Sequence, residues 1–411
     1  MIQFKKDLLI LCEYFYPDLA ATSKLMTELA EDLVRSGLSV DAYCSYPSYV
    51  QNKSNVEGLT KKEIFKGIQI RRFQNPHFNK NTKIGRILNY FSFSFFIFIN
   101  IFSLRNYRMI LLLSNPPLLP IFGYISKKLF RNKYFYLIHD LYPNNAIAIG
   151  TIKNENIVAK VMRFVNNRAF NDAELIIVLG EDVKRYLCSV YETAQENKVI
   201  VIPNWADKEK IQIKDKKNPV SIKMEFDNKF IVMYTGNLGI LQDLELVIEC
   251  AAMIKDMDDI LFVFVGEGAK KQKLIKMTEE HNLKNVKFIE FKEGEEYVET
   301  LAFADCFILT LEKCAEGLAV PSKSYTYMAA GKPIIGIISK DTDIGKIIEK
   351  ENIGCRIDYG DVESLSDRIR FLYENSSTCK QLGNNARALF ESNFERKRIT
   401  PLYCEIVKKH M

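Results

Sequence analysis

The sequence predicts two doubly wound α/β domains, each a Rossmann-like parallel sheet covered by helices on both faces. Three observations predict this fold class. The chain has 411 residues, which is too long for one ordinary domain. Short apolar runs alternate with amphipathic segments, and the alternation restarts after a polar stretch near residue 207. The runs are almost continuously apolar, as is typical of parallel strands buried on both faces.

The first series of elements occupies residues 1–206 and predicts the N-terminal Rossmann-like domain. An apolar run at 8–14 is followed by a helical segment at 24–35, which we expect to stop at Gly37. Further strands are expected at 39–46, 68–73, 109–114, 134–140, 175–180 and 198–204.

The second series occupies residues 229–390 and predicts a second Rossmann-like domain. The stretch 207–228 is polar, charged and poor in helix or strand signal, so we expect a linker there. The final segment, 391–411, is expected to be a helix that packs back across the domains. In this architecture the carboxyl ends of both sets of strands face a shared cleft. Strands are expected at 230–236, 261–266, 286–291, 306–311 and 333–338.

Composition excludes several classes of protein. Charged residues make up 26% of the chain, which is close to the globular average and argues against disorder. The nine cysteines are scattered without a CxxC pair, and the four histidines lack metal-ligand spacing. We therefore expect reduced thiols in the cytoplasm and no metal site. The N-terminal residues lack a cleavable signal pattern, so secretion is not expected.

Nicotinamide and P-loop chemistry are also not expected. The turn after the first strand, at 13–24, contains no glycine, whereas a dinucleotide-binding turn reads GxGxxG. The nearest match, at 266–268, continues Ala-Lys-Lys and lacks the third glycine. No Walker A loop occurs in the sequence.

Two loops carry more specific signals for phosphate binding. Ser322 and Lys323 begin a helix between two apolar runs, and a helix N-terminus attracts anions through its free N–H groups. Ser322 has a second interpretation, because serine is also a common helix cap. Gly236 and Gly239 follow a strand and precede a helix, where glycine permits close approach of the backbone to a ligand or simply a tight turn.

Six motifs occur in the order typical of one enzyme family. They are FYPDLAATSK and its continuation to residue 49, HDLYPNNAIAIG (139–150), VIPNWAD (201–207), GNLG with Gln242, VGEG (265–268), and PSK…YMAAGKP (321–333). Together they resemble the retaining two-domain glycosyltransferases of family four, which have the GT-B fold. More narrowly, they resemble the branch that builds O-antigen and capsule saccharides, including UDP-N-acetyl-fucosamine transferases.

This resemblance implies that the C-terminal domain, residues 229–390, binds a UDP-sugar donor and that the N-terminal domain, residues 1–206, binds the acceptor. His139 would lie against the donor sugar, and Lys323 would be the main positive charge on the departing diphosphate, where most of the catalysis is expected. Backbone N–H groups around Ala20, Ala21 and Thr22 would bind the same diphosphate. No metal or other cofactor is expected, because lysine and helix dipoles do that work. Further implied donor contacts are Gly236, Asn237, Gln242, Glu267, Phe291, Glu316, Ser322 and Thr326.

The sequence departs from the family at several of these positions. Leu318 and Thr326 stand where the broader family has two glutamates, the second of which ordinarily binds the ribose. Glu316 lies close by and is either their substitute or a solvated loop acid. Asn237 and Gln242 replace an arginine and a lysine, which leaves Lys323 to compensate.

Two other candidates also have purely structural interpretations. His139 could be a strand-end histidine bonded to Asp140 or to the backbone, with Asp140 itself acting as a cap. Glu267 could be a simple turn acid. The departures at Leu318 and Thr326 leave open a catalytically degenerate subunit that acts as a scaffold.

A basic, aromatic stretch sets the N-terminal domain apart. Residues 52–133 contain 15 basic residues and two acidic ones, and the chain between Arg86 and Arg105 is uncharged. On a helical projection four phenylalanines share one face, and serine and asparagine share the other. We expect an amphipathic helix near 84–104 lying in the plane of an anionic membrane surface. A buried helix and a spanning helix are the alternatives, and nucleic-acid binding is not expected. The phenylalanines are Phe91, Phe95, Phe98 and Phe102.

The expected function is therefore that of a retaining glycosyltransferase of capsule or O-antigen biosynthesis. It would move a sugar, with N-acetyl-fucosamine as one candidate, from a UDP-sugar donor to a polyprenyl-diphosphate-linked saccharide. The protein would be cytoplasmic and attached peripherally to the inner face of the cell membrane. A UDP-sugar 2-epimerase of the same architecture is the alternative enzyme.

Overall fold

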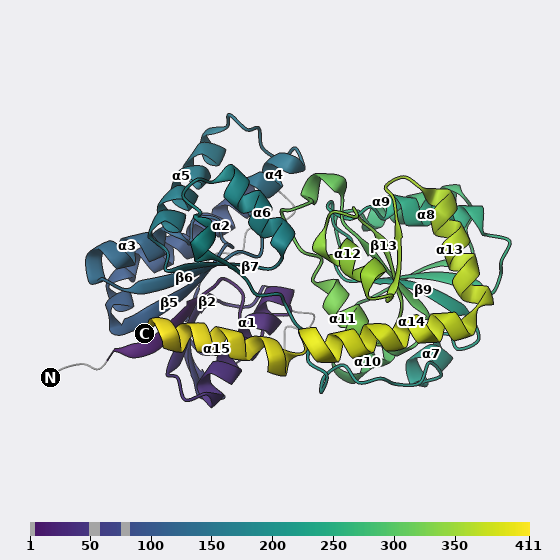
Figure 1. The fold of residues 1–411 in the computed structure, drawn as a ribbon, viewed down its shortest axis with the longest axis horizontal. Helices are drawn as coiled ribbons and strands as arrows, with labels where there is room; N and C mark the ends of the chain where they lie inside the picture. Colours follow the sequence, from purple (N-terminus) through teal and green to yellow (C-terminus); the bar gives the residue numbers. More distant parts are fainter. Residues whose placement is uncertain (1–4, 49–57, 75–82) are drawn as a thin grey trace. The chain divides into compact units, whose positions relative to one another are not determined.

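The structure is a computed structural model and describes residues 5–48, 58–74 and 83–411. The chain divides into two compact units, Met1–Pro203 with Ile399–Met411, and Asn204–Arg398. Each unit is built around one largely parallel sheet with helices packed on it (Figure 1). The predicted fold class, two doubly wound Rossmann-like domains, is confirmed.

The sheet of the first unit has eight strands in the order β3-β4-β2-β1-β5-β6-β7-β8. Neighbouring strands run parallel except β3 and β4. Each apolar run predicted as a strand contains one, because these runs fill both buried faces of the sheet. The strands are β1 (Lys6–Leu11), β2 (Val40–Ser45), β3 (Lys62–Phe65), β4 (Ile68–Phe73), β5 (Tyr107–Leu113), β6 (Lys133–Leu137), β7 (Leu175–Val178) and β8 (Val199–Val201).

The edge strand β3 was not predicted. It pairs with β4 as an antiparallel hairpin whose turn is Lys66-Gly67, and both turn residues have positive φ, 48° and 83°. Such a two-residue turn matches the right-handed twist of the strands it joins. The strand escaped the sequence pattern because it is charged and none of its residues is fully buried.

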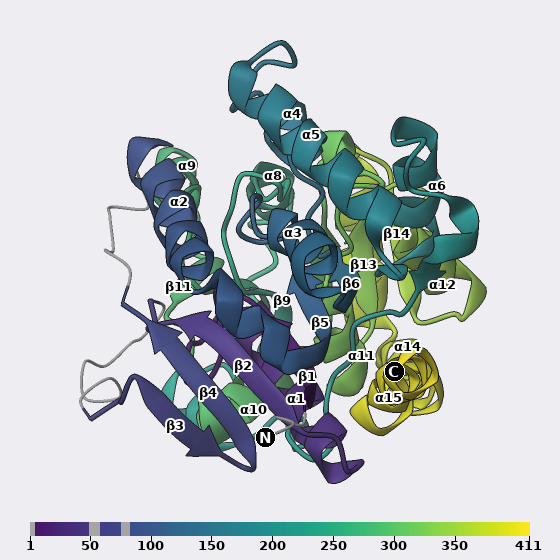
Figure 2. The ribbon, with the colours of Figure 1, turned by 90° about the vertical axis from the view of Figure 1, so that its left-hand side faces the viewer.

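Helices cover both faces of this sheet. The helices α2, α3 and α5 lie on one face, and α1 lies on the other (Figure 2). This division follows from right-handed crossovers, since the chain leaves β1 toward β2 and later returns through α2 to β5 on the other side of β1. The helices are α1 (Ala21–Arg35), α2 (Lys83–Ile99), η2 (Ile101–Asn106), α3 (Ile121–Phe130), α4 (Asn144–Ala148), α5 (Ile157–Asp172), α6 (Glu181–Val190) and η3 (Glu196–Lys198).

The second unit has a six-stranded parallel sheet in the order β11-β10-β9-β12-β13-β14. Its strands coincide with the predicted runs, except for β14, a short and partly exposed strand that the sequence does not signal. Residues 207–228, expected as a linker, lie within this unit. The strands are β9 (Phe230–Thr235), β10 (Ile260–Val265), β11 (Val286–Ile289), β12 (Cys306–Thr310), β13 (Ile334–Ile337) and β14 (Gly354–Ile357).

Alternate residues of these strands enter two separate hydrophobic clusters. Met233 and Phe307 pack on one face with α10, α11, α12 and α14, whereas Val232 and Ile308 pack on the other with α8, α9 and α13. The helices are α7 (Pro219–Lys223), α8 (Glu245–Met253), α9 (Lys271–Glu280), α10 (Gly294–Ala302), η4 (Lys313–Ala315), α11 (Lys323–Ala329), α12 (Asp343–Lys350), α13 (Val362–Glu374) and α14 (Ser376–Leu389).

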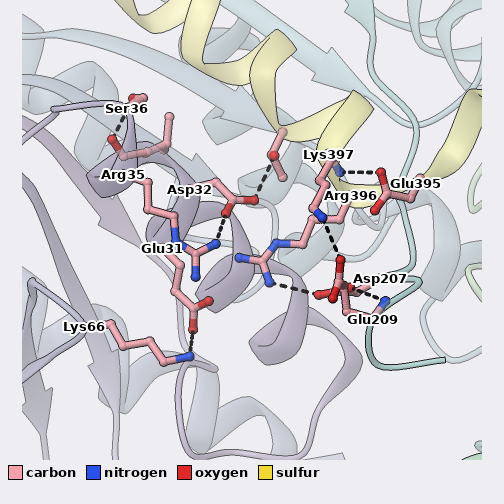
Figure 3. Close-up of polar contacts among 12 residues, drawn as sticks. Glu31, Asp32, Arg35, Ser36, Lys66, Asp207, Glu209, Glu395, Arg396 and Lys397 are labelled. Carbon is pink, nitrogen blue, oxygen red and sulfur yellow. Dashed lines mark hydrogen bonds and ion pairs between the residues drawn. The ribbon is translucent and has the colours of Figure 1, made fainter. Parts of the chain in front are cut away.

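The end of the chain is helical, as predicted. The π-helical turn η5 (Phe390–Phe394) leads into α15 (Arg396–His410). Arg396 forms a buried ion pair with Asp207 within the second unit, at 3.2 Å (Figure 3). Residues 399–411 belong to the first unit, where the Thr400 hydroxyl donates to Asp32 at 2.9 Å.

Within the described residues, no helix combines the length and apolar character needed to cross a membrane. The expected amphipathic segment forms α2, whose 17 residues fall short of a span.

Candidate active site

The candidate donor site of the second unit lies where the strand order reverses. The strands β10 and β11 continue on one side of β9, and the chain then returns to place β12 on its other side. The loops that leave the carboxyl ends of β9 and β12 diverge at this point, which is where open α/β sheets bind ligands. The first loop contains Gly236, and the second leads into α11 at Lys323.

Glycines allow two loops at this edge to pack backbone against backbone. The N–H groups of Gly236 and Leu238 donate to the carbonyls of Val265 and Glu267, each at 2.8 Å. A side chain at Gly266 would come within 2.2 Å of the Gly236 carbonyl oxygen. Glycine is therefore required at Gly266 by the contact between the loops themselves.

Replacing Gly266 with alanine is expected to lower the free energy of unfolding by roughly 3 kcal/mol. Its φ of +140° is unfavourable for alanine, and the new methyl group meets backbone that cannot move aside. Gly360→Ala is the matched control, because its φ is +78° and nothing lies within 4 Å of the added carbon. It should cost about 1 kcal/mol. Urea unfolding of both variants tests this, and equal losses would contradict it.

Lys323 occupies the centre of this loop cluster. Its side chain passes over Gly236, where an added Cβ would meet the lysine Cε at 2.5 Å. Its Nζ lies 4.9 Å from the centre of the Tyr234 ring. Burial lowers the pKa of Lys323 to about 8, and no neighbouring charge among the described residues contributes to that shift. Among the described residues, the site thus holds a partly desolvated cation that lacks a carboxylate partner, which favours an anionic ligand.

The first turns of α11 carry two further predicted residues. Ser322 stands at the N-cap position but makes no capping hydrogen bond, so the simple cap interpretation does not hold. The Thr326 side chain hydrogen bonds with Tyr297, and the Tyr297 ring lies 5.0 Å from that of Phe291. Burial raises the pKa of Tyr297 to about 12, so this phenol stays protonated as a hydrogen-bond donor.

Three other predicted donor contacts, Asn237, Gln242 and Glu267, lie in the loops that follow β9 and β10. The Gln242 Oε1 accepts a hydrogen bond from the Gly239 N–H at 3.0 Å, so its amide is engaged within its own loop. The side chain of Asn237 is exposed. Glu267 is also exposed and pairs with Lys271, which agrees with the turn-acid interpretation.

Glu316, the proposed substitute for the missing glutamates, has a specific partner. It accepts a hydrogen bond from the Tyr359 hydroxyl at 2.9 Å. Tyr359 follows β14, the edge strand at the opposite side of the sheet from β11, and its hydroxyl also accepts from the Ser339 N–H. Glu316 is therefore anchored toward that edge of the sheet rather than freely solvated, and Leu318 beside it is buried.

In the first unit, the predicted loop forms the N-terminus of α1. Ala20 is the N-cap residue and Ala21 the first helical residue, and no side chain caps the helix. The 15-residue helix begins at the carboxyl end of β1, beside the point where the strand order of this sheet reverses. Thr22 lies in its first turn. The Ala20 N–H donates to the Asp18 side chain at 3.1 Å, so any attraction for an anion at this helix start comes from the following N–H groups and the helix dipole.

His139 follows β6 in the same unit. The Ser114 hydroxyl accepts hydrogen bonds from the N–H groups of His139 and Asp140, both at 3.1 Å. The imidazole Nε2 is buried without a partner among the described residues. Asp140 instead accepts from the Asn145 side chain at 3.1 Å. The histidine is therefore positioned through its backbone, and its ring is not bonded to Asp140.

Burial lowers the pKa of His139 to about 4, from an ordinary value of 6.5. The unfolded chain binds a proton between these two values and the folded protein does not, so acidification through this window destabilises the fold. His139→Gln is expected to make the loss of stability between pH 6.5 and 4 shallower. Denaturant unfolding at several pH values measures it, with the exposed His281→Gln as control. Parallel pH profiles of wild type and H139Q would refute it.

The predicted membrane face of α2 is solvent-exposed. Phe91, Phe95, Phe98 and Phe102 are 54%, 60%, 58% and 66% exposed, and we call them the phenylalanine row. The opposite side of the helix is packed, with Phe93 fully buried. The alternative of a buried helix is therefore wrong. Arg105 is exposed, whereas the side chain of Arg86 lies outside the described part of the structure.

Some residues of this region were not predicted. Tyr234 and Tyr297 contact Lys323 and Thr326 from other segments of the chain. Lys270 donates to the Gln242 carbonyl at 2.7 Å and to Glu245 at 2.8 Å, and thereby fixes the loop after β9. Lys270 lies just after the VGEG motif (265–268), and only the folded chain places its ammonium group. In the described residues, no three acidic, histidine or cysteine side chains come together as a metal site.

Known proteins are similar to this chain in sequence and in fold. Residues 215–389 match the family described as Glycosyl transferases group 1. A Pseudomonas aeruginosa protein named "Probable glycosyltransferase WbjE" is 26% identical over 82% of this chain and 84% of its own length. WcaI of Escherichia coli K12, whose name places it in colanic acid biosynthesis, is 30% identical over 43% of this chain and 44% of its own.

Solved structures agree in fold. Anabaena HepE in complex with UDP has a TM-score of 0.74 at 15% identity, covering 98% of this chain and 100% of that one. WaaG, a glycosyltransferase involved in lipopolysaccharide biosynthesis, has a TM-score of 0.71 at 14% identity, covering 97% and 99%. These likenesses establish the GT-B fold. The match over residues 215–389 and the sequence relatives indicate that the chain is a glycosyltransferase.

Proposed function

We propose that this glycosyltransferase transfers a sugar, with retention of configuration, from a UDP-sugar to a polyprenyl-diphosphate-linked saccharide of the cell envelope. The observation that carries the donor half of the proposal is Lys323, which lies over Gly236 at the switch point of the sheet and has no carboxylate partner in the described part of the chain. HepE, which has the same fold, was solved with UDP bound. The names of WcaI and WaaG, which refer to colanic acid and lipopolysaccharide biosynthesis, support the acceptor class.

In this mechanism Lys323 neutralises the diphosphate as the bond to the sugar breaks. Negative charge on the leaving phosphate grows in the transition state, so a preorganised cation there lowers the barrier more than it strengthens ground-state binding. Thr326 and Tyr297 offer hydroxyl groups beside it, at the position where the broader family has its ribose-binding glutamate. We propose no metal in this step, because the lysine and backbone N–H groups supply the positive charge.

We further propose that the first unit docks on the inner face of the cell membrane. The phenylalanine row faces solvent, and a second apolar row on α5 lies on the same side of the sheet (Figure 2). Basic residues accompany both rows, and no acidic residue occurs in α2 or η2. Such a surface suits anionic lipid. The exposed residues of the second row are Ile157, Val161 and Phe164, which are 71%, 45% and 55% exposed.

The test is an assay of UDP release with the full chain, a panel of UDP-sugars and a polyprenyl-diphosphate-linked sugar. UDP-N-acetyl-fucosamine and related N-acetyl-amino sugars are the first donors to try. Transfer that depends on the acceptor supports the proposal. Turnover of a UDP-sugar without acceptor would instead indicate the 2-epimerase, and UDP binding without any transfer would indicate a scaffold. No binding of UDP at all would refute the donor assignment.

A further inference from the structure

A charged cavity lies in the first unit, and none of its described lining residues was predicted as a donor contact. It has a volume of about 410 Å³ and opens at the carboxyl ends of β2 and β4, against the last turns of α2. This volume is within the range of small-ligand sites. Three of its described lining residues are cations, Lys61, Arg71 and Arg72, and none is acidic. We call it the Arg71 cavity.

Arg72 is a structural part of this cavity. It is fully buried, pairs with Glu63, and donates to the Tyr16 carbonyl at 2.9 Å. One positive charge is therefore neutralised within the protein, and Arg72 serves to fix the end of β4. The net charge of the cavity comes from the other two cations.

Arg71 is held in place without being neutralised. Its Nη2 donates to the Asn100 side chain at 2.5 Å, and its guanidinium group lies over the rings of Tyr43 and Phe73, at 5.4 and 5.0 Å. Its Nε is buried without a hydrogen-bond partner among the described residues. A guanidinium group fixed in this way, with no carboxylate partner among the described residues, is suited to a phosphate or carboxylate.

The nearby carboxylate does not cancel this charge. Asp41 shares a neighbouring cavity of about 240 Å³ with Arg71. Its oxygens are taken by the Lys6 ammonium group at 2.7 and 2.9 Å and by the Tyr107 hydroxyl at 2.7 Å. Lys61 is exposed at the rim of the Arg71 cavity, and no ion pair is recorded for it within the described residues.

The apolar wall of the cavity connects it to the phenylalanine row. Phe96 and Ile99 line the cavity from α2, and Ile99 is itself 55% exposed. Phe95 and Phe98, their neighbours on the same helix turns, face solvent. If those rings enter the acyl boundary of a bilayer, the cavity stands at the depth of the phosphate groups. Its ligand should therefore combine an anionic head with an apolar tail.

We propose that the Arg71 cavity binds the diphosphate of the lipid-linked acceptor at the membrane surface. This inference rests on the proposed function, which supplies an acceptor with a diphosphate between its lipid and its saccharide. Arg71 and Lys61 grip the phosphate oxygens, and Phe96 and Ile99 contact the first part of the lipid chain. The lipid-linked acceptor and a bulk phospholipid both carry a phosphate ester attached to a lipid. Of these two ligands, the cavity is assigned to the acceptor.

The test uses the full chain with farnesyl diphosphate, a soluble short-chain isoprenyl diphosphate, measured by calorimetry. Arg71→Gln is expected to weaken its binding about ten- to a hundredfold, because a charge-assisted hydrogen bond is lost. Lys61→Gln is expected to weaken it several-fold, and since that residue is exposed its loss leaves the fold intact. Arg35→Gln, an exposed arginine on α1 across the sheet, is the matched control. Farnesol should bind wild type and R71Q equally.

Two further measurements separate the sources and the hypotheses. Vesicles of phosphatidylglycerol without isoprenyl diphosphate should bind wild type and R71Q alike. If R71Q loses vesicle binding but still binds farnesyl diphosphate as the wild type does, the cavity recognises a phospholipid head and the acceptor assignment is overturned. The acceptor assignment is also overturned if R71Q and K61Q both bind farnesyl diphosphate with the affinity of the wild type. R71Q should bind UDP with the same affinity as the wild type. If the donor assignment is wrong, neither protein binds UDP, and this result does not depend on the binding of farnesyl diphosphate.

Discussion

Replacing Lys323 with methionine is expected to lower the rate of sugar transfer at least about a hundredfold while leaving the protein folded. Methionine keeps most of the apolar length that crosses Gly236, so the loop contact survives and only the charge is lost. The ammonium group is partly desolvated and pairs with no carboxylate of residues 5–48, 58–74 or 83–411, so its removal should not lower the free energy of unfolding, and a small gain is expected.

This combination distinguishes a functional cation from a structural one. Initial rates of UDP release and urea unfolding, measured on the same samples, provide the two readings. Lys346→Met, an exposed lysine on α12, is the matched control and should change neither. Transfer near the wild-type rate would rule out a role for Lys323 at the diphosphate, and a large loss of stability would make it structural.

The pKa of Lys323 adds a pH dependence with a fixed sign. Burial lowers this pKa to about 8, so the free enzyme loses the positive charge as the pH rises through that value. Affinity for the UDP anion should be fully present below pH 8 and should fall above it, and kcat/KM should show the same alkaline limb. Arginine stays charged throughout, so in Lys323→Arg the limb should disappear even if the rate is reduced.

Replacing Phe95 and Phe98 together with glutamate is expected to weaken binding to phosphatidylglycerol vesicles by at least about a hundredfold. Each buried phenylalanine contributes roughly 1.5–3 kcal/mol, and the added carboxylates are repelled by anionic lipid. Both side chains are more than half exposed, at 60% and 58%, so the free energy of unfolding should change by less than about 0.5 kcal/mol.

Vesicle sedimentation measures this effect, and the chain offers a matched control. Ile222 and Phe371 are 50% and 42% exposed on α7 and α13 of the other unit. Their double replacement with glutamate should leave vesicle binding intact. Val161→Glu with Phe164→Glu then asks whether α5 belongs to the same surface, and an intermediate loss is expected. Equal sedimentation of all variants would mean that neither row meets the bilayer.

The sequence predicted most strands and the outward face of α2, because both depend on patterns within a few residues. The spacing of Phe91, Phe95 and Phe98 marks one face of a helix, and the serines opposite them mark the other. A spacing of the same kind on α5, at Ile157, Val161 and Phe164, was not recognised as a surface. The spacing of apolar residues alone does not show which face of a helix packs against the core.

The candidate site was predicted only where it lies within one motif. Lys323 follows from its place at a helix start, but its contact with Gly236 joins segments 87 positions apart in the chain. The same holds for Tyr297 beside Thr326 and for the cations of the Arg71 cavity. Such contacts depend on the order of the strands and on how closely neighbouring loops pack, and a single sequence predicts neither.

The return of the chain to its first unit has a consequence for synthesis. Ile399, Tyr403 and Val407 of α15 are each at most 4% exposed and belong to the unit formed by residues 1–203. Domains generally fold in the order in which they leave the ribosome. Here the first unit is complete only after about 200 further residues have been translated, and until then the apolar residues that pack against α15 stay exposed. A nascent chain stalled before residue 399 should therefore be a stronger client for chaperones than the finished protein.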